Sequence, residues 1–561
     1  MNKSESTRYP EVILNERQLC DLELLLNGGF APLKGFLREA DYNSVVKKMR
    51  LSTGELWAMP IVLTITSKDA NKYKDCKNVT LKNSEGMPLA IMDNIELYKP
   101  DLVKECENVY GSSDTNHPYV KIVLGAGDVF YMGGELRLIQ MPRHFDFKEH
   151  RLTPEQTKAY FQENGWTKVV GFQTRNPMHR SHFELTKYAL SEAGEDAKLL
   201  LHPVVGITQE CDINYHTRVR CYRKLIKHYD ENSALLSLLP LSMRMAGPRE
   251  AVWHAQVRKN YGCTHFVVGR DHAGPSYKKK DGSDFYGPYD AQELLMANAE
   301  EIGINVITSK MIIFAMPKGF EGEITEANGE FVRIDQVNKD THDVMNISGT
   351  KQREMLANGE QIPSWFSFPE VVEELQFDFK KKCQQGFCLY FVGLSGSGKS
   401  TLANAVLCKL RELERHRQIT VLDGDIIRRH LSKGLGFNRD DRSINVQRIG
   451  YVASEIVKHN GIVFSANIAP YQSDRLVNRE LIGAYGHYIE VYVDTPISEC
   501  EKRDAKGLYQ LARQGVIKEF TGISDPFEEP TNAELHINGA GDLDSNVDLI
   551  INYLREQGLI C

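Results

Sequence analysis

The sequence predicts a multidomain protein that is mainly α/β, and three observations lead to this prediction. The chain has 561 residues, which suggests roughly three or four domains at about 150 residues each. From about residue 166, short apolar runs that end in polar or glycine-rich corners alternate with amphipathic helical stretches, a pattern typical of parallel sheets. A polar segment with three consecutive lysines, residues 376–386, interrupts this alternation, which then restarts, so the segment indicates a linker.

The composition is that of an ordinary globular protein, with 42% hydrophobic and 25% charged residues. Lys and Arg number 68 and Asp and Glu 75, so the formal net charge is −7; this gives no bulk electrostatic reason to expect nucleic acid or membrane as a partner. No apolar run approaches the roughly 20 residues that span a bilayer, and the first residues lack the apolar core of a signal peptide. The 11 Cys include no C-x-x-C pair, so we expect free thiols and a cytoplasmic location.

Four domains are predicted along the chain. Residues 1–165 are expected to be rich in β-structure, because turn residues separate short apolar stretches such as 120–134. Residues 166–322 carry the strand candidates KVVGFQ, KLLLHPVVG and HFVVGRD, and ligands are expected where these parallel strands end. Residues 323–386 are assigned to a small third domain and the linker. Residues 387–561 form a last α/β domain, with the strand candidates FCLYFVGL, QITVLDGD, GIVFSANIAPY and YIEVYVDTP.

The strongest motif is a P-loop, because Gly393–Ser400 matches G-x-x-x-x-G-K-[ST] between an apolar strand and an amphipathic helix. Its glycines allow backbone amides to curl around phosphate oxygens, and the helix N-terminus adds partial positive charge. Lys399 is expected to reach the outer phosphates, and the Ser400 hydroxyl to bind Mg²⁺. The alternative is a vestigial loop that binds a nucleotide without catalysis. The predicted nucleotide-binding residues are Gly393, Ser395, Gly396, Ser397, Gly398, Lys399, Ser400 and Thr401.

Two carboxylates, Asp423 and Asp425, end the next strand candidate and would face the P-loop across the edge of the sheet. One of them would accept a proton from an attacking hydroxyl or bind Mg²⁺ through water. The alternative is that they cap the following helix. Arg428, Arg442 and Arg448 then offer cationic groups for a second anionic ligand.

The last domain resembles APS kinase over about 387–540, through the P-loop, LDGDIIRRHLSKGLGFNRDDRSINVQRIGYVA, NIAPYQSDR and KGLYQLARQGVIKEFTGISDPFEEP. The resemblance implies transfer of the γ-phosphoryl group of ATP to the 3′-hydroxyl of adenosine 5′-phosphosulfate (APS), which gives PAPS. It implies that Asp425 is the candidate base and that Asp423 lies near the metal. It also implies an APS site with Arg428, Phe437, Arg442 and Asn445, and a mobile closing segment with Lys506 and Phe520.

Two residues depart from that family's usual pattern. The family often reads ISPYR where this chain has Ile468–Gln472. Ala469 replaces a serine that is sometimes phosphorylated in relatives, and Gln472 removes one possible anion contact. Neither change touches the P-loop or the pair of aspartates, so we expect an active kinase.

The segment QTRNPMHRSH predicts a second anion site, in residues 166–322. Asn176 is expected to cap a helix whose first residue is Pro177, which places His179 and His182 on one face of its first turn. The helix dipole and the free amides at that end attract phosphate. A metal-binding pair and a purely structural pair are the alternatives, although no third ligand follows at a suitable spacing.

A glycine-containing loop, Gly269–Pro275, follows the strand candidate HFVVG. It offers flexible backbone amides and the cation Arg270 at a strand end, where ligands usually bind in such sheets. Arg244, Arg249 and Trp253 are expected to be domain scaffolding.

Residues 10–375 resemble ATP sulfurylase, through RQLCDLELLLNGGFAPLKGFL, QTRNPMHRSH, MRMAGPREAVWHA, GRDHAGP and ISGTKQREMLANGEQIPSWFSFPEVVEEL. The resemblance implies a PUA-like N-terminal domain, a Rossmann-like nucleotidyltransferase domain, a small third domain, and conversion of MgATP and sulfate to APS and pyrophosphate. It implies that sulfate is held by Gln173, Arg175 and the amide of Ala273, and ATP by Thr174, Asn176, His179, His182, Gly269 and Arg270. Gln209 stands where the family often has Lys, which weakens the case for a phosphate-contacting cation there.

The expected first reaction needs no general base, because sulfate is already an anion and the difficulty is bringing it against the anionic α-phosphorus. We assign catalytic roles to Arg175, His179, His182, Arg270, Lys399 and Asp425. The preferred hypothesis is an enzyme that makes APS and converts it to PAPS. The alternatives are a sulfurylase whose kinase-like domain only binds PAPS as an allosteric inhibitor, and a sulfurylase that runs in reverse. We expect ATP, sulfate, APS and PAPS as ligands, Mg²⁺ as MgATP, no tightly bound cofactor, and a homo-oligomer.

Overall fold

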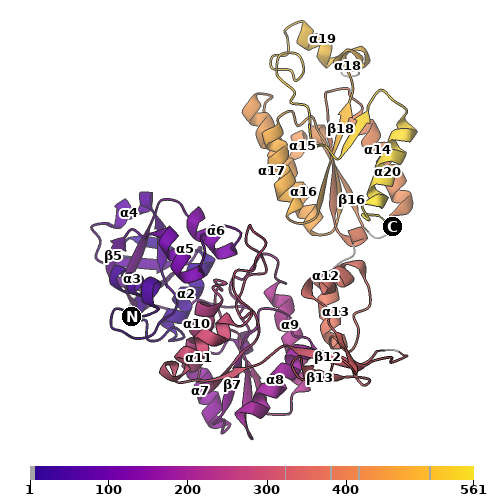
Figure 1. Cartoon of the computed structure of the whole chain (residues 1–561). Helices are drawn as coiled ribbons and strands as arrows, with labels where there is room; N and C mark the ends of the chain where they lie inside the picture. Colours follow the sequence, from indigo (N-terminus) through magenta and orange to yellow (C-terminus); the bar gives the residue numbers. More distant parts are fainter. Residues whose placement is uncertain (1–6, 323, 379–381, 415–416, 505–506, 561) are drawn as a thin grey trace. The chain divides into compact units, whose positions relative to one another are not determined.

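The computed structural model describes residues 7–322, 324–378, 382–414, 417–504 and 507–560 (Figure 1). The chain divides into two compact units, one of residues 1–349 and 362–378 and the other of residues 350–361 and 379–561. In the described ranges, no helix is both long and apolar enough to cross a membrane.

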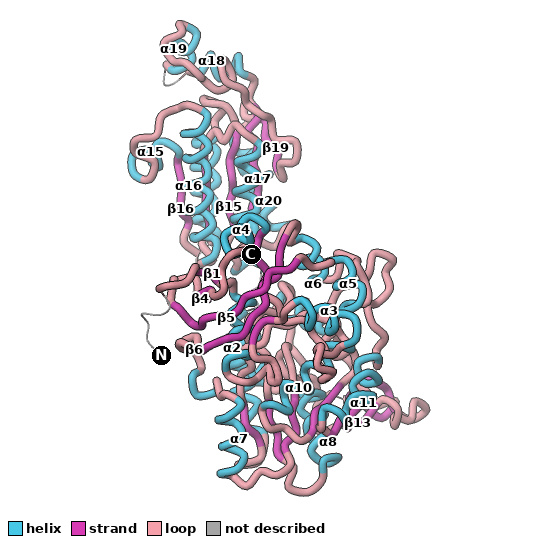
Figure 2. Tube along the Cα trace, turned by 90° about the vertical axis from the view of Figure 1, so that its left-hand side faces the viewer, coloured by secondary structure: helices cyan, strands magenta, loops and turns pink. Residues whose placement is uncertain are grey.

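The N-terminal part of the first unit consists of β1 (Glu11–Ile13), α2 (Glu16–Leu26), β2 (Gly35–Phe36), α3 (Glu39–Lys48), β3 (Leu63–Thr66), α4 (Ser67–Tyr73), β4 (Val79–Lys82), β5 (Pro88–Tyr98), α5 (Leu102–Tyr110), α6 (Pro118–Gly125) and β6 (Val129–Leu138). Its strands form one sheet in the order β1-β4-β5-β6-β2, with β3 also paired to β6. Strand β1 runs parallel to β4, while β4, β5 and β6 are antiparallel neighbours that lie side by side in Figure 2. The predicted β-rich N-terminal domain is confirmed.

One detail of that prediction is wrong, because the apolar stretch 120–134 is not a single strand. Its first half lies in α6, and only its second half lies in β6. Pro118 occupies the first turn of α6, and the His117 ring accepts from the backbone N–H of Tyr119 and Val120. A cap and an N-terminal proline start a helix here despite the β-branched residues that follow.

The central part of the first unit is a parallel α/β layer. It consists of η1 (Lys148–His150), α7 (Pro154–Glu163), β7 (Val169–Phe172), α8 (Arg180–Ala193), β8 (Lys198–Leu201), α9 (Tyr215–Leu225), η2 (Ile226–His228), β9 (Ala234–Leu236), α10 (Pro248–Asn260), β10 (His265–Val268), α11 (Asp290–Ile302) and β11 (Asn305–Thr308). The strands are all parallel and run in the order β11-β10-β7-β8-β9. The loops that follow β7, β8 and β10 therefore meet at one edge of the sheet, as predicted.

A small antiparallel sheet completes the first unit. Its strands β12 (Ile312–Pro317), β13 (Glu330–Arg333) and β14 (His342–Met345) run in the order β13-β12-β14. Phe314 and Met316 from β12 pack with Trp365, which precedes α13 (Pro369–Asp378). This sheet begins ahead of the predicted boundary at residue 323, and the four domain boundaries stay predictions.

The second unit consists of α12 (Gly349–Asn358), η3 (Lys382–Gln384), β15 (Phe387–Val392), α14 (Lys399–Leu413), β16 (Ile419–Asp423), α15 (Gly424–His430), α16 (Arg439–Lys458), β17 (Ile462–Ala466), α17 (Gln472–Gly483), β18 (His487–Asp494), α18 (Ile497–Arg503), α19 (Leu508–Arg513), β19 (Leu535–Asn538) and α20 (Leu543–Glu556). Its parallel strands run in the order β16-β17-β15-β18-β19. Helices α14 and α20 cover one face and α16 and α17 the other (Figure 1). All four predicted strands are confirmed.

Helix α10 ties the N-terminal sheet to the parallel sheet within the first unit. Every residue from Glu250 to Arg258 is buried. Just before the helix, Arg244 Nη2 lies 2.6 Å from Asp21 Oδ2 of α2, and both side chains are only 2% exposed. Arg249 donates to the carbonyls of Val45 and Val46 near the end of α3, at 3.0 and 2.9 Å. The scaffolding role predicted for Arg244 and Arg249 is confirmed.

We predict that Asp21→Ala destabilises the first unit by about 3–5 kcal/mol, because the buried Arg244 guanidinium loses its carboxylate partner. All four Trp of the chain lie between residues 57 and 365, so tryptophan fluorescence during denaturant unfolding reports on this unit. Asp128→Ala is the matched control, since it breaks an ion pair with Lys99 whose side chains are 65% and 63% exposed, and it should destabilise the unit far less. Equal losses in the two variants would contradict the prediction.

Candidate active sites

The QTRN corner leads from β7 toward α8 and is held by hydrogen bonds from Thr174 and from two residues of α9. The Thr174 hydroxyl accepts from the Asn176 backbone N–H at 3.1 Å, and the Thr174 side chain is almost fully buried. From α9, Arg218 donates to the carbonyl of Arg175 at 2.9 Å, and the Tyr222 hydroxyl donates to the carbonyl of Asn176 at 2.7 Å. The backbone of the corner is therefore fixed before any ligand binds. Gln173 Nε2 lies 3.6 Å from Met243 Sδ.

Helix α8 begins later than predicted. Its N-cap is His179 and its first residue is Arg180, so Asn176 is not the cap and Pro177 is not the first helical residue. Two hydrogen bonds between the Thr174 hydroxyl and the backbone of Asn176 hold this corner outside the helix instead. The two histidines still lie together at the helix N-terminus, with ring centroids 6.0 Å apart.

The two histidine rings are held by different partners. His179 Nδ1 lies 3.0 Å from the Ser367 hydroxyl, and its ring packs on Phe366 at 4.6 Å between centroids. His182 Nδ1 accepts from the backbone N–H of His179 at 3.3 Å. Desolvation lowers the pKa of His182 to about 4, so the ring is neutral at pH 7 and carries its proton on Nε2. A neutral imidazole with its proton on Nε2 is a hydrogen-bond donor suited to a phosphate oxygen.

Arg175 lies between two loops at the sheet edge. Its Nη1 is 2.7 Å from each carboxylate oxygen of Asp212, and its Nη2 donates to the carbonyl of Gly274 at 3.2 Å. Both charged side chains are largely buried, at 13% and 5% exposed. The carboxylate offsets part of the cationic charge and fixes the plane of the guanidinium, whose Nε belongs to no hydrogen bond among those of the described residues.

Gln209 connects the same two loops. Its side-chain oxygen accepts from the backbone N–H of Ser276 at 2.9 Å, and its Nε2 donates to the Ser276 hydroxyl at 3.2 Å. Its own backbone N–H donates to Asp212 at 3.3 Å. The residue is 6% exposed, so its amide forms a buried connection between the two loops beside Arg175.

The loop that follows β10 completes this edge. Arg270 is half-exposed and pairs with Asp271 at 3.0 Å. Asp271 and Ala273 both have left-handed backbone conformations, with φ of 52° and 55°, and the Ala273 carbonyl accepts from the Gly247 N–H at 3.1 Å. The structure thus brings the predicted residues of the first site to one sheet edge, as expected from the ends of β7 and β10: Gln173, Thr174, Arg175, Asn176, His179, His182, Gly269, Arg270 and Ala273.

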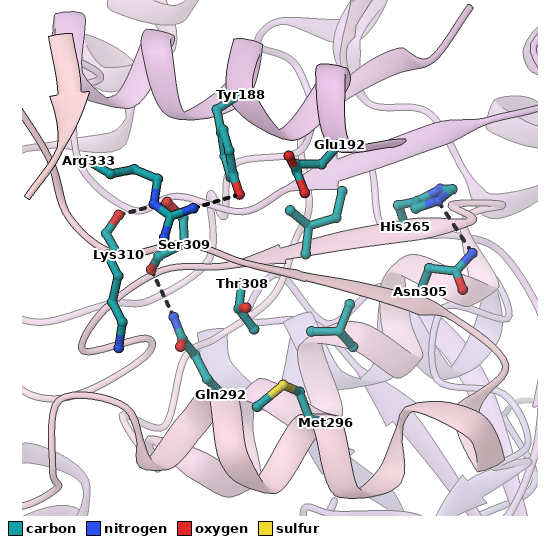
Figure 3. A pocket seen from close by; sticks show the side chains of 12 residues that line it. Tyr188, Glu192, His265, Gln292, Met296, Asn305, Thr308, Ser309, Lys310 and Arg333 are labelled. Atoms are coloured by element: carbon teal, nitrogen blue, oxygen red, sulfur yellow. Dashed lines mark hydrogen bonds between the residues drawn. The ribbon is translucent and has the colours of Figure 1, made fainter. Parts of the chain in front are cut away.

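A cavity of about 590 Å³ lies elsewhere in this unit, along the edge strand β11 and between α8 and α11 (Figure 3). Tyr188 and Arg333 approach each other at one end, 3.5 Å apart, and His265 and Asn305 lie 3.3 Å apart at the other. Its lining contains none of the predicted site residues.

In the second unit, the P-loop forms the predicted turn between β15 and α14. Gly393, Gly396 and Gly398 have φ of 155°, 73° and 100°, conformations that side chains rarely adopt. The Lys399 ammonium donates to the carbonyls of Gly393 and Leu394 at 2.9 and 2.6 Å. The loop is therefore already curled around the position of its lysine. Ser397 is fully buried, whereas Thr401 lies on the exposed face of α14.

Asp423 lies at the end of β16, opposite the P-loop. Its Oδ2 is 3.5 Å from the Ser400 hydroxyl, and its Oδ1 accepts from the Ile426 N–H at 3.4 Å. The residue thus caps α15 and also faces Ser400, so the two readings of this carboxylate are compatible. A hydroxyl and a carboxylate at this spacing suit Mg²⁺ held directly or through water. Asp425 lies within α15, and its side chain is outside the described part of the structure.

The residues predicted for APS lie around α15 and α16. The Arg428 guanidinium stacks over the Phe437 ring at 4.4 Å and donates to the Gly436 carbonyl at 2.8 Å. Phe437 is 64% exposed, whereas Asn445 is buried. A π-face backed by a cation offers a stacking surface for an adenine ring.

Arg442 connects α16 to the segment after α19. It donates to Asp525 at 2.8 Å and also to the Thr521 hydroxyl and the Glu519 carbonyl. Phe520 is buried in a small cluster with Cys500 and Tyr509, against which Leu394 of the P-loop packs. The predicted closing segment therefore contacts the P-loop, although Lys506 lies outside the described residues.

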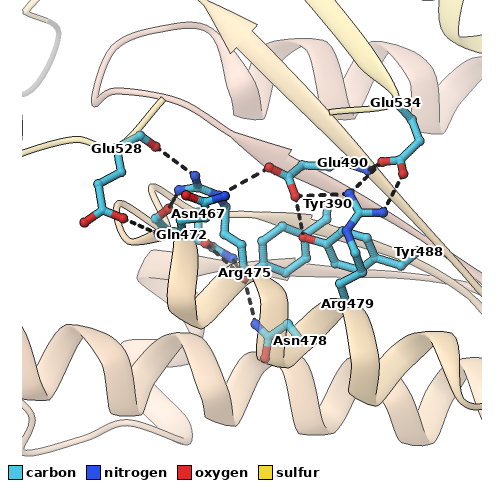
Figure 4. A network of polar contacts seen from close by, with 11 residues as sticks. Tyr390, Asn467, Gln472, Arg475, Asn478, Arg479, Tyr488, Glu490, Glu528 and Glu534 are labelled. Atoms are coloured by element: carbon cyan, nitrogen blue, oxygen red, sulfur yellow. Dashed lines mark hydrogen bonds and ion pairs between the residues drawn. The ribbon is translucent and has the colours of Figure 1, made fainter. Parts of the chain in front are cut away.

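A buried network supports the loop after β17 (Figure 4). Arg475 donates to the carbonyls of Ala469 and Glu528, each at 2.8 Å, and lies 3.2 Å from Glu490. Ala469 is itself buried, with φ of 41°. The Gln472 backbone N–H donates to the Glu528 carboxylate at 2.6 Å. The two residues that depart from the kinase pattern, Ala469 and Gln472, therefore lie in a loop held by hydrogen bonds to Arg475 and Glu528.

Several neighbours of these sites were not predicted from the sequence. In the first unit they are Asp212, Arg218 and Tyr222, and around the P-loop they are Thr495, Arg503 and Tyr509. The Tyr509 hydroxyl donates to the Ser395 carbonyl and the Thr495 hydroxyl to the Ser397 carbonyl, each at 2.8 Å. Long-range contacts of this kind carry no local sequence signal, although Asp212 does follow the strand candidate KLLLHPVVG at the ligand edge.

Fold and sites together define a nucleotide-dependent transferase, with one candidate anion site at the edge of a parallel α/β sheet and a P-loop on another sheet. Family profiles match in the same order: PUA-like domain over residues 1–141, ATP-sulfurylase over 148–377 and adenylylsulphate kinase over 385–538. The chain belongs to the sulfate adenylyltransferase family, in a form that also carries an adenylylsulphate kinase domain.

Relatives cover almost the whole chain. It is 44% identical to the sulfate adenylyltransferase of Chaetomium globosum, over 99% of this chain and 95% of the relative. It is 43% identical to that of Yarrowia lipolytica, with the same coverage. Among solved structures, a hexameric APS kinase from Thiobacillus denitrificans matches with a TM-score of 0.78 and 30% identity, over 100% of this chain and 96% of that one.

We predict that His182 titrates with a midpoint near pH 4 rather than at its ordinary value of 6.5. The folded pKa is lowered, so the unfolded state takes up this proton first. The contribution to stability is complete above pH 6.5 and is lost as the pH falls toward 4. NMR of histidine-labelled protein checks the midpoint, with the signal assigned by its loss in His182→Asn. A midpoint near 6.5 would contradict the desolvation of this ring and would make it a partial cation at neutral pH.

Proposed function

We propose that this chain activates sulfate in two steps, first forming APS and pyrophosphate from MgATP and sulfate, then PAPS and ADP from APS and ATP. The observation that carries the proposal is the pairing of a full-length match to sulfate adenylyltransferases with an intact, pre-curled P-loop. The first feature supports adenylyl transfer and the second supports phosphoryl transfer.

In the first step, sulfate oxygen attacks the α-phosphorus and pyrophosphate leaves. We assign sulfate to Gln173, Arg175 and the Ala273 amide. We assign ATP to the residues beside them, namely Thr174, Asn176, His179, His182, Gly269 and Arg270. No proton is removed from the nucleophile, so the protein's task is to orient two anions and offset the charge that develops on pyrophosphate. The neutral His182 Nε2–H and the helix N-terminus beside it suit that charge.

In the second step, the P-loop amides and Lys399 hold the phosphates of ATP. Arg428, Phe437, Arg442 and Asn445 hold APS, while Lys506 and Phe520 belong to the segment that covers the nucleotides. Asp425 orients or deprotonates the 3′-hydroxyl of APS, which attacks the γ-phosphorus. Mg²⁺ bound with ATP would be held by Ser400 and Asp423, and when bound it neutralises phosphate charge.

The ligands of the proposed function are ATP, sulfate, APS and PAPS, with Mg²⁺ entering as MgATP. We place the enzyme in the cytoplasm, which suits a chain whose 11 cysteines include no C-x-x-C pair. We also propose a homo-oligomer, a proposal supported by the hexameric state named for the Thiobacillus denitrificans relative.

A second candidate function is favoured by one observation: the names of the fungal relatives state only the adenylyltransferase activity. In this candidate the second unit binds PAPS and regulates the first. The intact Gly393–Ser400 motif, with Lys399 anchored and Ser400 facing Asp423, favours catalysis.

We predict that Arg175→Ala and Lys399→Ala separate the two activities. Arg175→Ala should lower APS formation by about a hundredfold or more, because one well-aimed donor is worth about 3 kcal/mol, and should leave phosphorylation of added APS unchanged. Lys399→Ala should do the reverse. Pyrophosphate release and ADP release, assayed separately, measure the two steps. Normal APS formation by Arg175→Ala would refute the sulfate assignment.

We predict that wild-type protein converts added APS and MgATP to PAPS, and that Asp425→Asn abolishes this conversion while APS synthesis continues. Direct chromatography of PAPS measures it. The regulatory candidate predicts a different result. In that case wild-type protein makes no PAPS, and added PAPS inhibits APS formation cooperatively until Lys399→Ala or Arg428→Ala removes the inhibition.

A further inference from the structure

The loop assigned to the sulfate subsite is strained on both sides of one histidine. Asp271 and Ala273 have φ of 52° and 55° and flank His272. A left-handed conformation is unfavourable for a residue other than glycine and persists only where the surroundings impose it. Contacts with other elements must therefore hold His272 and its neighbours in place.

The contacts come from α10 and from the segment just before it, all within the first unit. The Gly247 N–H donates to the Ala273 carbonyl at 3.1 Å. The His272 ring meets a second ring, with Nε2 lying 3.1 Å from His254 Nδ1. On the far side of His254, Nε2 lies 3.3 Å from Glu250 Oε1 in a charge contact that is not a hydrogen bond, and both of these side chains are fully buried.

Glu250 determines which of the two histidine rings donates the hydrogen bond between them. Its two oxygens accept from the backbone N–H of Arg244 at 3.0 Å and of Ala246 at 2.7 Å. These bonds fix the turn at Met245, another left-handed residue, with φ of 59°. Glu250 faces His254 Nε2 without a hydrogen bond among the described residues, and the negative charge of its oxygen favours a proton on that nitrogen. His254 Nδ1 is then an acceptor, and His272 Nε2 must donate to it.

His254 is fully buried and His272 is half-buried, in surroundings that disfavour charge. Burial holds the pKa of His254 and of His272 well below the ordinary value, and the neighbouring Arg258 guanidinium lowers both further. Arg175, the cation assigned to sulfate, also lowers the pKa of His272, so the ring lies within electrostatic range of that guanidinium. A neutral ring pair with one fixed proton order is the arrangement that results.

We propose that Glu250 and His254 are positioning residues for the sulfate subsite. Glu250 fixes the tautomer of His254, whose Nδ1 accepts a hydrogen bond from His272 Nε2, and this bond holds the strained Asp271–Ala273 loop with the Ala273 amide available to sulfate. This inference rests on the proposed function, because it deepens the assignment of that amide. Neither residue touches a substrate, and no proton is transferred along the chain during the reaction.

Two substitutions of His254 distinguish its contact with His272 from its contact with Glu250. An Asn side chain places its oxygen where Nδ1 stood, so His254→Asn retains an acceptor for His272. A Gln side chain places its amide where Nε2 stood, so His254→Gln retains only the contact with Glu250. Both remove part of a buried ring and should lower the thermal unfolding midpoint similarly.

We expect His254→Gln to lower kcat/KM for sulfate by roughly ten- to a hundredfold, because small misplacements of binding groups have effects of this size. His254→Asn should remain within about threefold of wild type. Phosphorylation of added APS should be unchanged in both, and it serves as the internal control. Equal losses in the two variants, or no loss in either, would overturn the proposal, whereas a wild-type protein that forms no APS would instead refute the proposed function.

A second measurement decides the matter if either variant fails to fold. Neutron diffraction from wild-type crystals locates the ring protons without any assay. We expect protons on His254 Nε2 and His272 Nε2 and none on either Nδ1. A proton on His254 Nδ1 would mean that His254 donates to His272 instead, and this would overturn the proposal.

Discussion

The burial of charged side chains in one segment, Arg244–Arg258, constrains much of the first unit. Removing an arginine or glutamate from water costs several kcal/mol unless partners replace the solvent. Arg244 therefore lies against Asp21 of α2, and Glu250 accepts from two backbone amides. Arg258 donates to the carbonyl of His202 at 3.0 Å, in the loop after β8. The partners of Arg244 and Arg258 belong to two other elements, so these contacts connect α2 and the loop after β8 to the segment that contains α10.

Both candidate sites use cations that the protein already orients. Arg175 is held by Asp212 and the Gly274 carbonyl, Lys399 by two carbonyls of its own loop, and Arg442 by Asp525. Orientation before binding reduces the entropy and reorganisation that an anion must otherwise supply. The acidic partner at Arg175 and Arg442 has a further effect, because it lowers the net positive charge of the site. Such a site discriminates by geometry more than by charge, which suits an enzyme that must choose sulfate and APS among many cellular anions.

The sequence predicted the parallel sheets because their central strands are buried on both faces. Runs such as Phe387–Val392 and Lys198–Leu201 are apolar almost throughout, and this needs no knowledge of distant residues. The edge strands β9, β11 and β19 escaped prediction, since each has only three or four residues and a mixed burial pattern. The start of α8 was misplaced because the Thr174–Asn176 contacts outweigh the local preference of Asn-Pro for a helix start. Partners such as Asp212 and His254 are distant in sequence from the residues they hold, so only the folded chain identifies them.

Gln209 illustrates how a departure from a family pattern is to be judged once the fold is known. From the sequence alone it is the loss of a cation beside an anion site. In the structure its amide both accepts from and donates to Ser276, which a lysine cannot do because its ammonium has no acceptor. The substitution therefore exchanges a mobile positive charge for a closed connection between the loops after β8 and β10. Arg175 lies between those loops, so a rigid connection preserves the orientation of the guanidinium that we propose binds sulfate.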